Sequence, residues 1–232
     1  MLLNKIDRNA QELLDELRLE YQIEFEASNI NYCQVTQKGR KATIQYNPKI
    51  FNSESIVHEL LHIWLDRYNY KIGNYVYLIC RGDKNLSKVF LKPLCDHIEN
   101  CFDHFKMYPK YIAMGYSAEG FMIDSLKEKC SIKDIDLVRT DTHGLHHAIS
   151  IKYFIGYLIS IYADHANNDY TVHLNLLSQK DHDLFEIVTR FWKSWLAFDI
   201  TKIDSIENSD IELCDNFLDE INSWIKKGVV IF

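Results

Sequence analysis

The chain has 232 residues, of which 47% are hydrophobic and 13% aromatic, enough apolar side chains to build a packed core. This composition excludes a protein that is disordered throughout. The formal net charge of −7 at pH 7, in a sequence with no basic run, argues against a nucleic-acid-binding surface. We therefore expect a folded protein with one large domain or two small ones.

Residues 1–21 predict an amphipathic helix, with Ile6, Leu13, Leu14 and Leu17 on one side. They lack the apolar stretch and the small-residue cleavage site of a signal peptide. The six cysteines of the chain show no CxxC spacing, which argues against both a zinc ribbon and a disulfide framework. These features predict a cytoplasmic protein with reduced thiols.

Short strands are expected after this helix. Residues 21–27 alternate apolar and polar side chains, as in a half-buried strand. Residues 31–37 and 41–47 flank a Lys-Gly-Arg turn, which predicts a hairpin. We expect residues 41–47, just before the next helix, to form an exposed edge strand. An extended peptide could pair with such a strand.

A helix over residues 53–68 carries the pentapeptide HELLH. Positions four apart lie on one face of a helix, so His58 and His62 can reach the same metal ion. Glu59 and Asp66 fall on the same polar stripe, about 100° wide, while the apolar residues occupy the opposite side. The sequence thus predicts that one side of this helix is buried and that the opposite side carries the histidines and carboxylates.

A second helix is predicted over residues 93–107, ending before Pro109. Asp96, Glu99 and Asp103 lie on one strip of it, within about 60° of one another. Carboxylates placed this close repel one another unless a cation is nearby. After an HExxH helix, this cluster favours a metal ligand over a solvated acidic face.

The other segments carry less chemical information. Residues 71–91 predict a strand and a loop, and the chain beyond Ser131 is expected to be mainly helical. The apolar stretch 148–163 is short for a membrane span and contains a lysine, so we interpret it as a buried helix. Ser209 and Glu212 have the spacing of a capping box that would begin the last helix.

HELLH followed by Glu99-Asn-Cys-Phe-Asp103 resembles the gluzincin pattern, HExxH plus ExxxD on the next helix of the site. In thermolysin-like members an aspartate follows four residues after the second histidine, and Asp66 stands at that place here. The resemblance implies a zinc site whose ligands are His58, His62 and Glu99, with Glu59 as general base and Asp103 as the acceptor that orients one histidine.

The layout of residues 20–107 also resembles the small ImmA/IrrE-type metallopeptidases, in which strands lead directly into the HExxH helix. This resemblance implies an α+β fold with a zincin-like core: a helix, a small mainly antiparallel sheet, the HExxH helix and a second ligand helix. We expect the core to span residues 1–125. A mainly helical C-terminal region, residues 126–232, would pack on it.

The function implied is that of an intracellular zinc-dependent metallopeptidase, in which Glu59 helps zinc-activated water to attack a peptide bond. The expected partner is a peptide or protein substrate, or a single regulatory protein, and neither nucleic acid nor a membrane. The residue that stabilises the oxyanion stays open among several candidates: His104, His143, His146, His147, Tyr116, Tyr153 and Tyr157. On the helical projection His104 lies on a different face from Glu99, which makes it the poorer ligand candidate.

Two other interpretations compete with this one. A metal-binding or pseudo-peptidase regulatory protein would act through protein–protein binding, although it would not need Glu59. A helical interaction protein could contain HELLH by accident, since composition alone produces an HExxH string in about 3% of such chains. The coincidence of HELLH with Glu99 and Asp103 argues against that second alternative.

Overall fold

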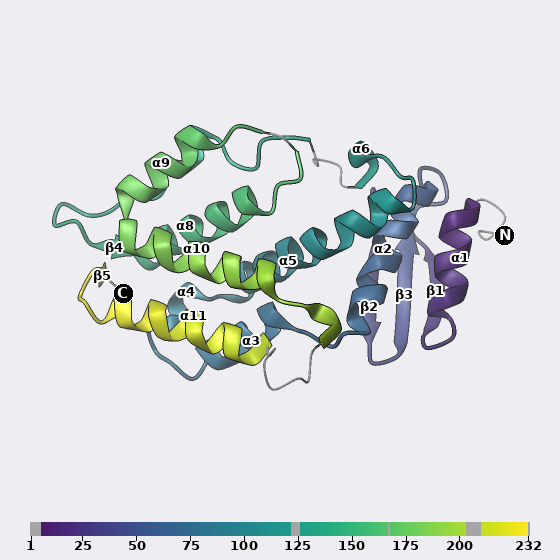
Figure 1. Cartoon of the computed structure of the whole chain (residues 1–232), viewed down its shortest axis with the longest axis horizontal. Helices are drawn as coiled ribbons and strands as arrows, with labels where there is room; N and C mark the ends of the chain where they lie inside the picture. Colours follow the sequence, from purple (N-terminus) through teal and green to yellow (C-terminus); the bar gives the residue numbers. More distant parts are fainter. Residues whose placement is uncertain (1–5, 122–125, 167, 203–209, 232) are drawn as a thin grey trace. The chain divides into compact units, whose positions relative to one another are not determined.

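The computed structural model describes residues 6–121, 126–166, 168–202 and 210–231. Its helices and strands confirm the predicted α+β class (Figure 1). The chain divides into two compact units, Met1–Asn69 with Phe105–Lys127 and Tyr70–His104 with Glu128–Phe232. The helix α5 (Lys92–Ala113) contributes to both units, because the division falls inside it after His104.

The first unit contains a sheet of β1 (Gln22–Ala27), β2 (Gln34–Lys38) and β3 (Lys41–Tyr46) in the order β1-β3-β2. The hairpin prediction is confirmed, since β2 pairs antiparallel with β3 across a turn in which Gly39 has φ +57°. However, β1 pairs with β3 in parallel, so the sheet is mixed rather than mainly antiparallel. The prediction that residues 41–47 form an edge strand is wrong: β3 is central and β2 lies at the edge.

Two helices complete the framework of this unit, α1 (Arg8–Leu17) and α2 (Ser53–Asp66). Leu13, Leu14 and Leu17 are buried on one side of α1 as predicted, whereas Ile6 lies before the helix and is half-buried. The helix packs against α2. The carboxylate of Asp66 accepts hydrogen bonds from the Tyr21 hydroxyl at 3.1 Å and from Gln37 Nε2 at 2.6 Å. These bonds fix the end of α2 to the sheet.

The long helix α5 continues through Pro109, so the prediction that it stops before this proline is wrong. A proline inside a helix lacks the N–H that would bond to the carbonyl four residues earlier. Here one such bond is given up and the helix runs on to Ala113. It ends where Gly115 takes a positive φ of +88°, and the short helix α6 (Ala118–Phe121) follows.

In the second unit, residues 71–91 form the helices α3 (Ile72–Cys80) and α4 (Leu86–Val89), and the predicted strand is wrong. A short apolar run can be a strand or a buried helix, and periodicity alone does not decide between them. Gly73 permits a close approach of α3 to α5, since a Cβ at this position would lie 2.3 Å from the Cys95 carbonyl oxygen and 2.6 Å from Glu99 Cβ.

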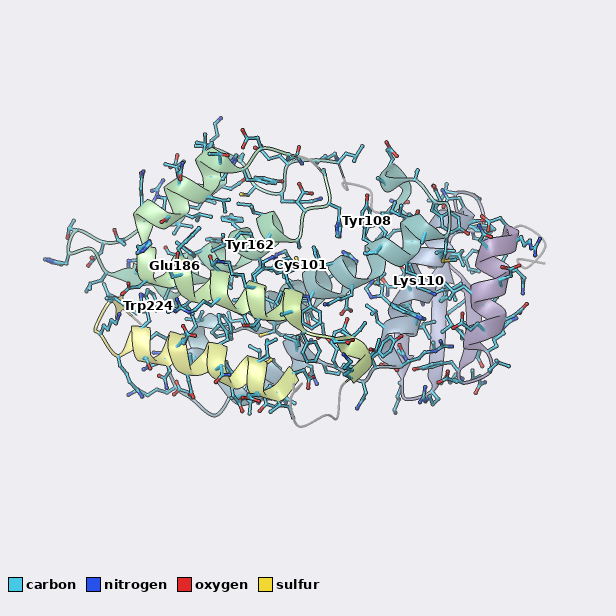
Figure 2. All side chains as sticks on the ribbon, in the orientation of Figure 1. Cys101, Tyr108, Lys110, Tyr162, Glu186 and Trp224 are labelled. Carbon is cyan, nitrogen blue, oxygen red and sulfur yellow. The ribbon has the colours of Figure 1, made fainter. Side chains whose placement is uncertain are left out.

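The rest of the second unit is mainly helical, as predicted. Its elements are α7 (Ile132–Ile135), β4 (His146–His147), α8 (Ala148–Tyr162), α9 (Thr171–Lys180), α10 (His182–Ala197), η1 (Ile200–Lys202), α11 (Asp210–Ile225) and β5 (Val230–Ile231). Aromatic side chains fill its interior. Tyr162, which is labelled in Figure 2, stacks on Trp192 and forms a hydrogen bond of 2.8 Å with the Thr189 hydroxyl. Ser209, part of the predicted capping box, lies outside the described residues.

The apolar stretch at 148–163 forms the buried helix α8, as predicted. None of the described helices combines the length and apolar character that crossing a membrane requires.

Candidate metal centre

HELLH lies in the middle of α2, whose first turn is fixed by a capping box between Asn52 and Ser55. The helix buries Ile56, Leu60 and Ile63 in the core of its unit. His58 and His62 lie one turn apart with ring centroids separated by 5.1 Å. The amphipathic pattern therefore brings the two imidazoles together as predicted.

A third histidine completes this group. One ring nitrogen each of His58, His62 and His104 lies within 4.8 Å of the other two, and His104 is only 8% exposed. His104 lies on α5 directly before Phe105, the first residue that this helix contributes to the unit of α2. Nitrogens bound tetrahedrally to one zinc ion at about 2.1 Å lie roughly 3.4 Å apart. Small movements of the three side chains would bring their nitrogens to this spacing. The histidine triad could bind a metal ion.

His58 is set up to be a neutral ligand. Removal of its ring from water lowers the pKa of His58, and the neighbouring His62 lowers it further, to about 3. A hydrogen bond with the backbone of Phe121 acts in the opposite direction but does not overcome these effects. Metals bind the neutral imidazole, so burial favours the form of His58 that a metal ion needs.

Glu59 follows His58 directly and is 8% exposed. Burial raises its pKa to about 7, although His62 and the Val35 backbone N–H both act to lower it. That N–H, at the edge strand β2, donates to Glu59 Oε2 at 2.8 Å. A carboxylate with a pKa near neutrality can both accept and release a proton under ordinary conditions.

A cavity of about 360 Å³ adjoins His58 and Glu59 in the first unit. Its walls include Tyr32, Ile50 and Phe51, and the only carboxylate among the lining residues is Glu59. Tyr32 is 54% and Ile50 57% exposed, so apolar surface lies open at the side of the cavity. The volume is large enough to admit a side chain and part of a peptide backbone.

No protein-family model, curated protein or solved structure matches this chain. The gluzincin resemblance therefore depends on the HELLH and Glu99-to-Asp103 motifs.

Glu99, the predicted third ligand, is not a member of the histidine group. It lies half-buried in the second unit beside Gly73 and forms a hydrogen bond with the backbone of Asn74. Burial raises its pKa, and the neighbouring carboxylate of Asp103 adds to the rise. Glu99 and His104 are five residues apart, which separates them by about 140° around α5.

Asp103, the predicted acceptor for a histidine, accepts a hydrogen bond from the Tyr70 hydroxyl at 2.8 Å in the second unit. Its predicted contact with a ligand histidine stays a prediction. His104, which was predicted to be the poorer ligand candidate, is the residue that lies with His58 and His62. The signal was available, since three histidines form a well-known zinc ligand set.

Proposed function

We propose that the protein is a zinc-dependent metallopeptidase whose metal ligands are His58, His62 and His104, with Glu59 as general base. The observation that carries the proposal is the histidine triad within 4.8 Å, next to a buried glutamate whose pKa is raised to about 7. We propose His104 in place of Glu99 as the third ligand.

The donor set fits zinc chemically. Three imidazoles leave one tetrahedral position open, as catalytic zinc sites require. A buried, neutral His58 contributes no charge that would repel the ion. Zinc held there would act as a Lewis acid that polarises a carbonyl group and makes water more acidic.

Glu59 is placed to move a proton. The Val35 N–H holds its Oε2 at 2.8 Å, which fixes the orientation of the carboxylate and directs an incoming proton to Oε1. With a pKa of about 7, the group can take a proton from water and then pass it to a leaving amine. Both transfers are needed to hydrolyse an amide.

A peptide is the substrate that suits the surroundings best. The edge strand β2 begins beside Glu59, since Val35 bonds to that carboxylate. An extended peptide could add to this edge with its backbone and place a side chain in the neighbouring cavity of about 360 Å³. We therefore propose β2, rather than β3, as the strand that pairs with the substrate.

The first test is the metal content of the purified chain. We expect about one zinc per wild-type chain, which is the content of a mononuclear site, and a sharp loss in His104→Ala. Glu99→Ala, on the same helix, should retain zinc. The opposite pattern, with zinc lost in Glu99→Ala and retained in His104→Ala, would restore Glu99 as the ligand.

The second test separates an enzyme from a metal-binding regulatory protein. Glu59→Gln should retain zinc and lose roughly 10²- to 10⁴-fold in the rate of cleavage of a peptide library, because only the proton transfer is removed. If the variant cleaves as fast as the wild-type protein, Glu59 is not the base. If neither protein cleaves while both bind zinc, the peptidase proposal fails and the binding function stands.

A further inference from the structure

The segment 114–121 is fastened to the first unit at several points after α5 ends. Asn9 Nδ2 donates to the Met114 carbonyl oxygen at 2.7 Å, and the Tyr116 hydroxyl donates to Asp7 at 2.7 Å. Asp7 also receives the N–H of Ala10 and so caps α1. These bonds bring the segment back toward the start of α2.

Glu54, in the first turn of α2, makes the next connection. Its Oε1 accepts hydrogen bonds from the Ser117 hydroxyl at 3.1 Å and from the Ser117 N–H at 3.4 Å. Glu54 precedes His58 by four residues, so the two side chains lie on the same side of the helix, one turn apart. The carboxylate therefore joins the segment to the face of α2 that carries the metal site.

Gly120 lies directly against this carboxylate. A Cβ at Gly120 would be 2.3 Å from Glu54 Cδ and Oε2, a distance at which atoms overlap. Its N–H also donates to the Ser117 hydroxyl at 3.2 Å. No residue with a side chain fits here unless Glu54 moves away.

The next residue, Phe121, contacts His58. Phe121 is 2% exposed, and its ring centroid lies 5.0 Å from that of His58. The Phe121 backbone also forms a hydrogen bond with His58. Such a bond selects the tautomer and fixes which ring nitrogen can face a metal ion.

We infer that Glu54 and Gly120 are positioning residues for the metal site: they close the segment 117–121 onto α2, so that the ring and backbone of Phe121 hold the His58 ring in its ligand orientation. The inference rests on the proposed metal site. It assigns to Glu54 a role outside the HELLH motif and explains why the position before Phe121 is a glycine.

The test measures zinc affinity of the full chain by competition with a chromophoric chelator, together with the visible spectrum of the Co²⁺-loaded protein. Gly120→Ala and Glu54→Ala should each weaken zinc binding about 10- to 100-fold, as loss of a partner of a ligand histidine usually does. Both should also change the Co²⁺ spectrum, because the His58 ring would rotate. Glu54→Gln retains an acceptor oxygen for Ser117 and should restore affinity and spectrum.

Gly82→Ala is the matched control, since a Cβ there would meet only the Ile79 carbonyl oxygen at 3.5 Å. It should bind zinc like the wild-type protein. If Gly120→Ala does not fold, the zinc affinities and Co²⁺ spectra of Glu54→Ala and Glu54→Gln test the positioning role on their own. Wild-type protein that binds no zinc would overturn the metal site itself. Wild-type and Glu54→Ala proteins with the same affinity and the same Co²⁺ spectrum would overturn the positioning role alone.

Discussion

Glu59 in the first unit and Asp181 in the second are both shielded from water, with Glu59 8% exposed and the Asp181 side chain 13% exposed. Each accepts a hydrogen bond from a backbone N–H, from Val35 at 2.8 Å and from Leu184 at 2.7 Å. Yet burial raises the pKa of Glu59 to about 7, while the pKa of Asp181 is lowered. The two carboxylates differ both in burial, since Glu59 is buried and Asp181 half-buried, and in the hydrogen bonds that they accept.

Hydrogen bonds set the direction of the pKa shift of Asp181. Burial alone would raise the pKa of Asp181, but hydrogen bonds from His146 Nε2, at 3.0 Å, and from Leu184 outweigh it. This pair caps α10 and holds it to β4, which is a structural role. In the first unit His58 lies against another histidine, and Glu59 keeps a raised pKa beside a cavity. A strongly shifted carboxylate in a cavity is typical of a functional site.

The largest expected effect comes from removing one histidine from each region. His62→Ala should weaken zinc binding by about a thousandfold or more, because one of three ligands is lost. His146→Ala should leave zinc affinity unchanged and lower the free energy of unfolding by about 1–3 kcal/mol, since Asp181 loses its partner. Chelator competition and urea unfolding measure the two quantities. Equal loss of zinc in both variants would remove the distinction between the regions.

Local patterns predicted the elements of the first unit well. Alternation gave β1, the turn at Gly39 gave the hairpin, and the i, i+4 spacing brought His58 to His62. The order of the strands was not predictable in this way. Alternation is the same for central and edge strands in a half-buried sheet, so nothing in residues 41–47 indicates that β3 has a partner on each side.

The grouping of His104 with His58 and His62 was not predicted, for a similar reason. The helical projection separated His104 from Glu99 correctly, but it does not say what each face of α5 contacts. Those contacts depend on tertiary packing: Gly73, for example, lets α3 approach the Glu99 side of the helix closely. On the acidic strip, Glu99 packs against Gly73 of α3 and Asp103 accepts a hydrogen bond from the Tyr70 hydroxyl.

The next effect in size concerns Glu59 in the metal-free protein. Its folded-state pKa of about 7 exceeds the ordinary value of 4.5, so the folded state retains a proton that the unfolded state releases between these values. Stability therefore falls as the pH rises through this range. Glu59→Gln should be more stable than wild type by about 3 kcal/mol above neutrality, and the difference should vanish in acid below the ordinary pKa.

Urea unfolding at both ends of this pH range, with chelator present, measures the difference. The Gln side chain retains an oxygen that can accept the Val35 N–H, so the comparison isolates the charge. Equal stability of the two proteins above neutrality would mean that Glu59 titrates near its ordinary value, and the contrast with Asp181 would disappear.

For Asp181→Asn, the change in the free energy of unfolding should have the opposite sign to that of Glu59→Gln and should be smaller. The folded-state pKa of Asp181 is lowered, so its contribution is complete above the unfolded pKa of 3.8 and is lost as the pH falls through the folded value. At neutral pH the variant should be less stable by about 1 kcal/mol, and the deficit should shrink in acid. Asn can still cap α10 by accepting the Leu184 N–H. A deficit that persists in acid would point to packing rather than charge.

The smallest expected effect tests the bond from Val35 to Glu59. Val35→Pro removes the N–H that stabilises the ionised carboxylate, so the pKa of Glu59 should rise further, because its charged form loses a donor. The acid limb of the pH profile of kcat/KM should then move upward by roughly half to one pH unit, which corresponds to one hydrogen bond of about 1 kcal/mol. Val35→Ala loses the side chain but retains the N–H, and its profile should match that of wild type. If both variants shift alike, the packing of Val35 and not its N–H sets the proton affinity of Glu59.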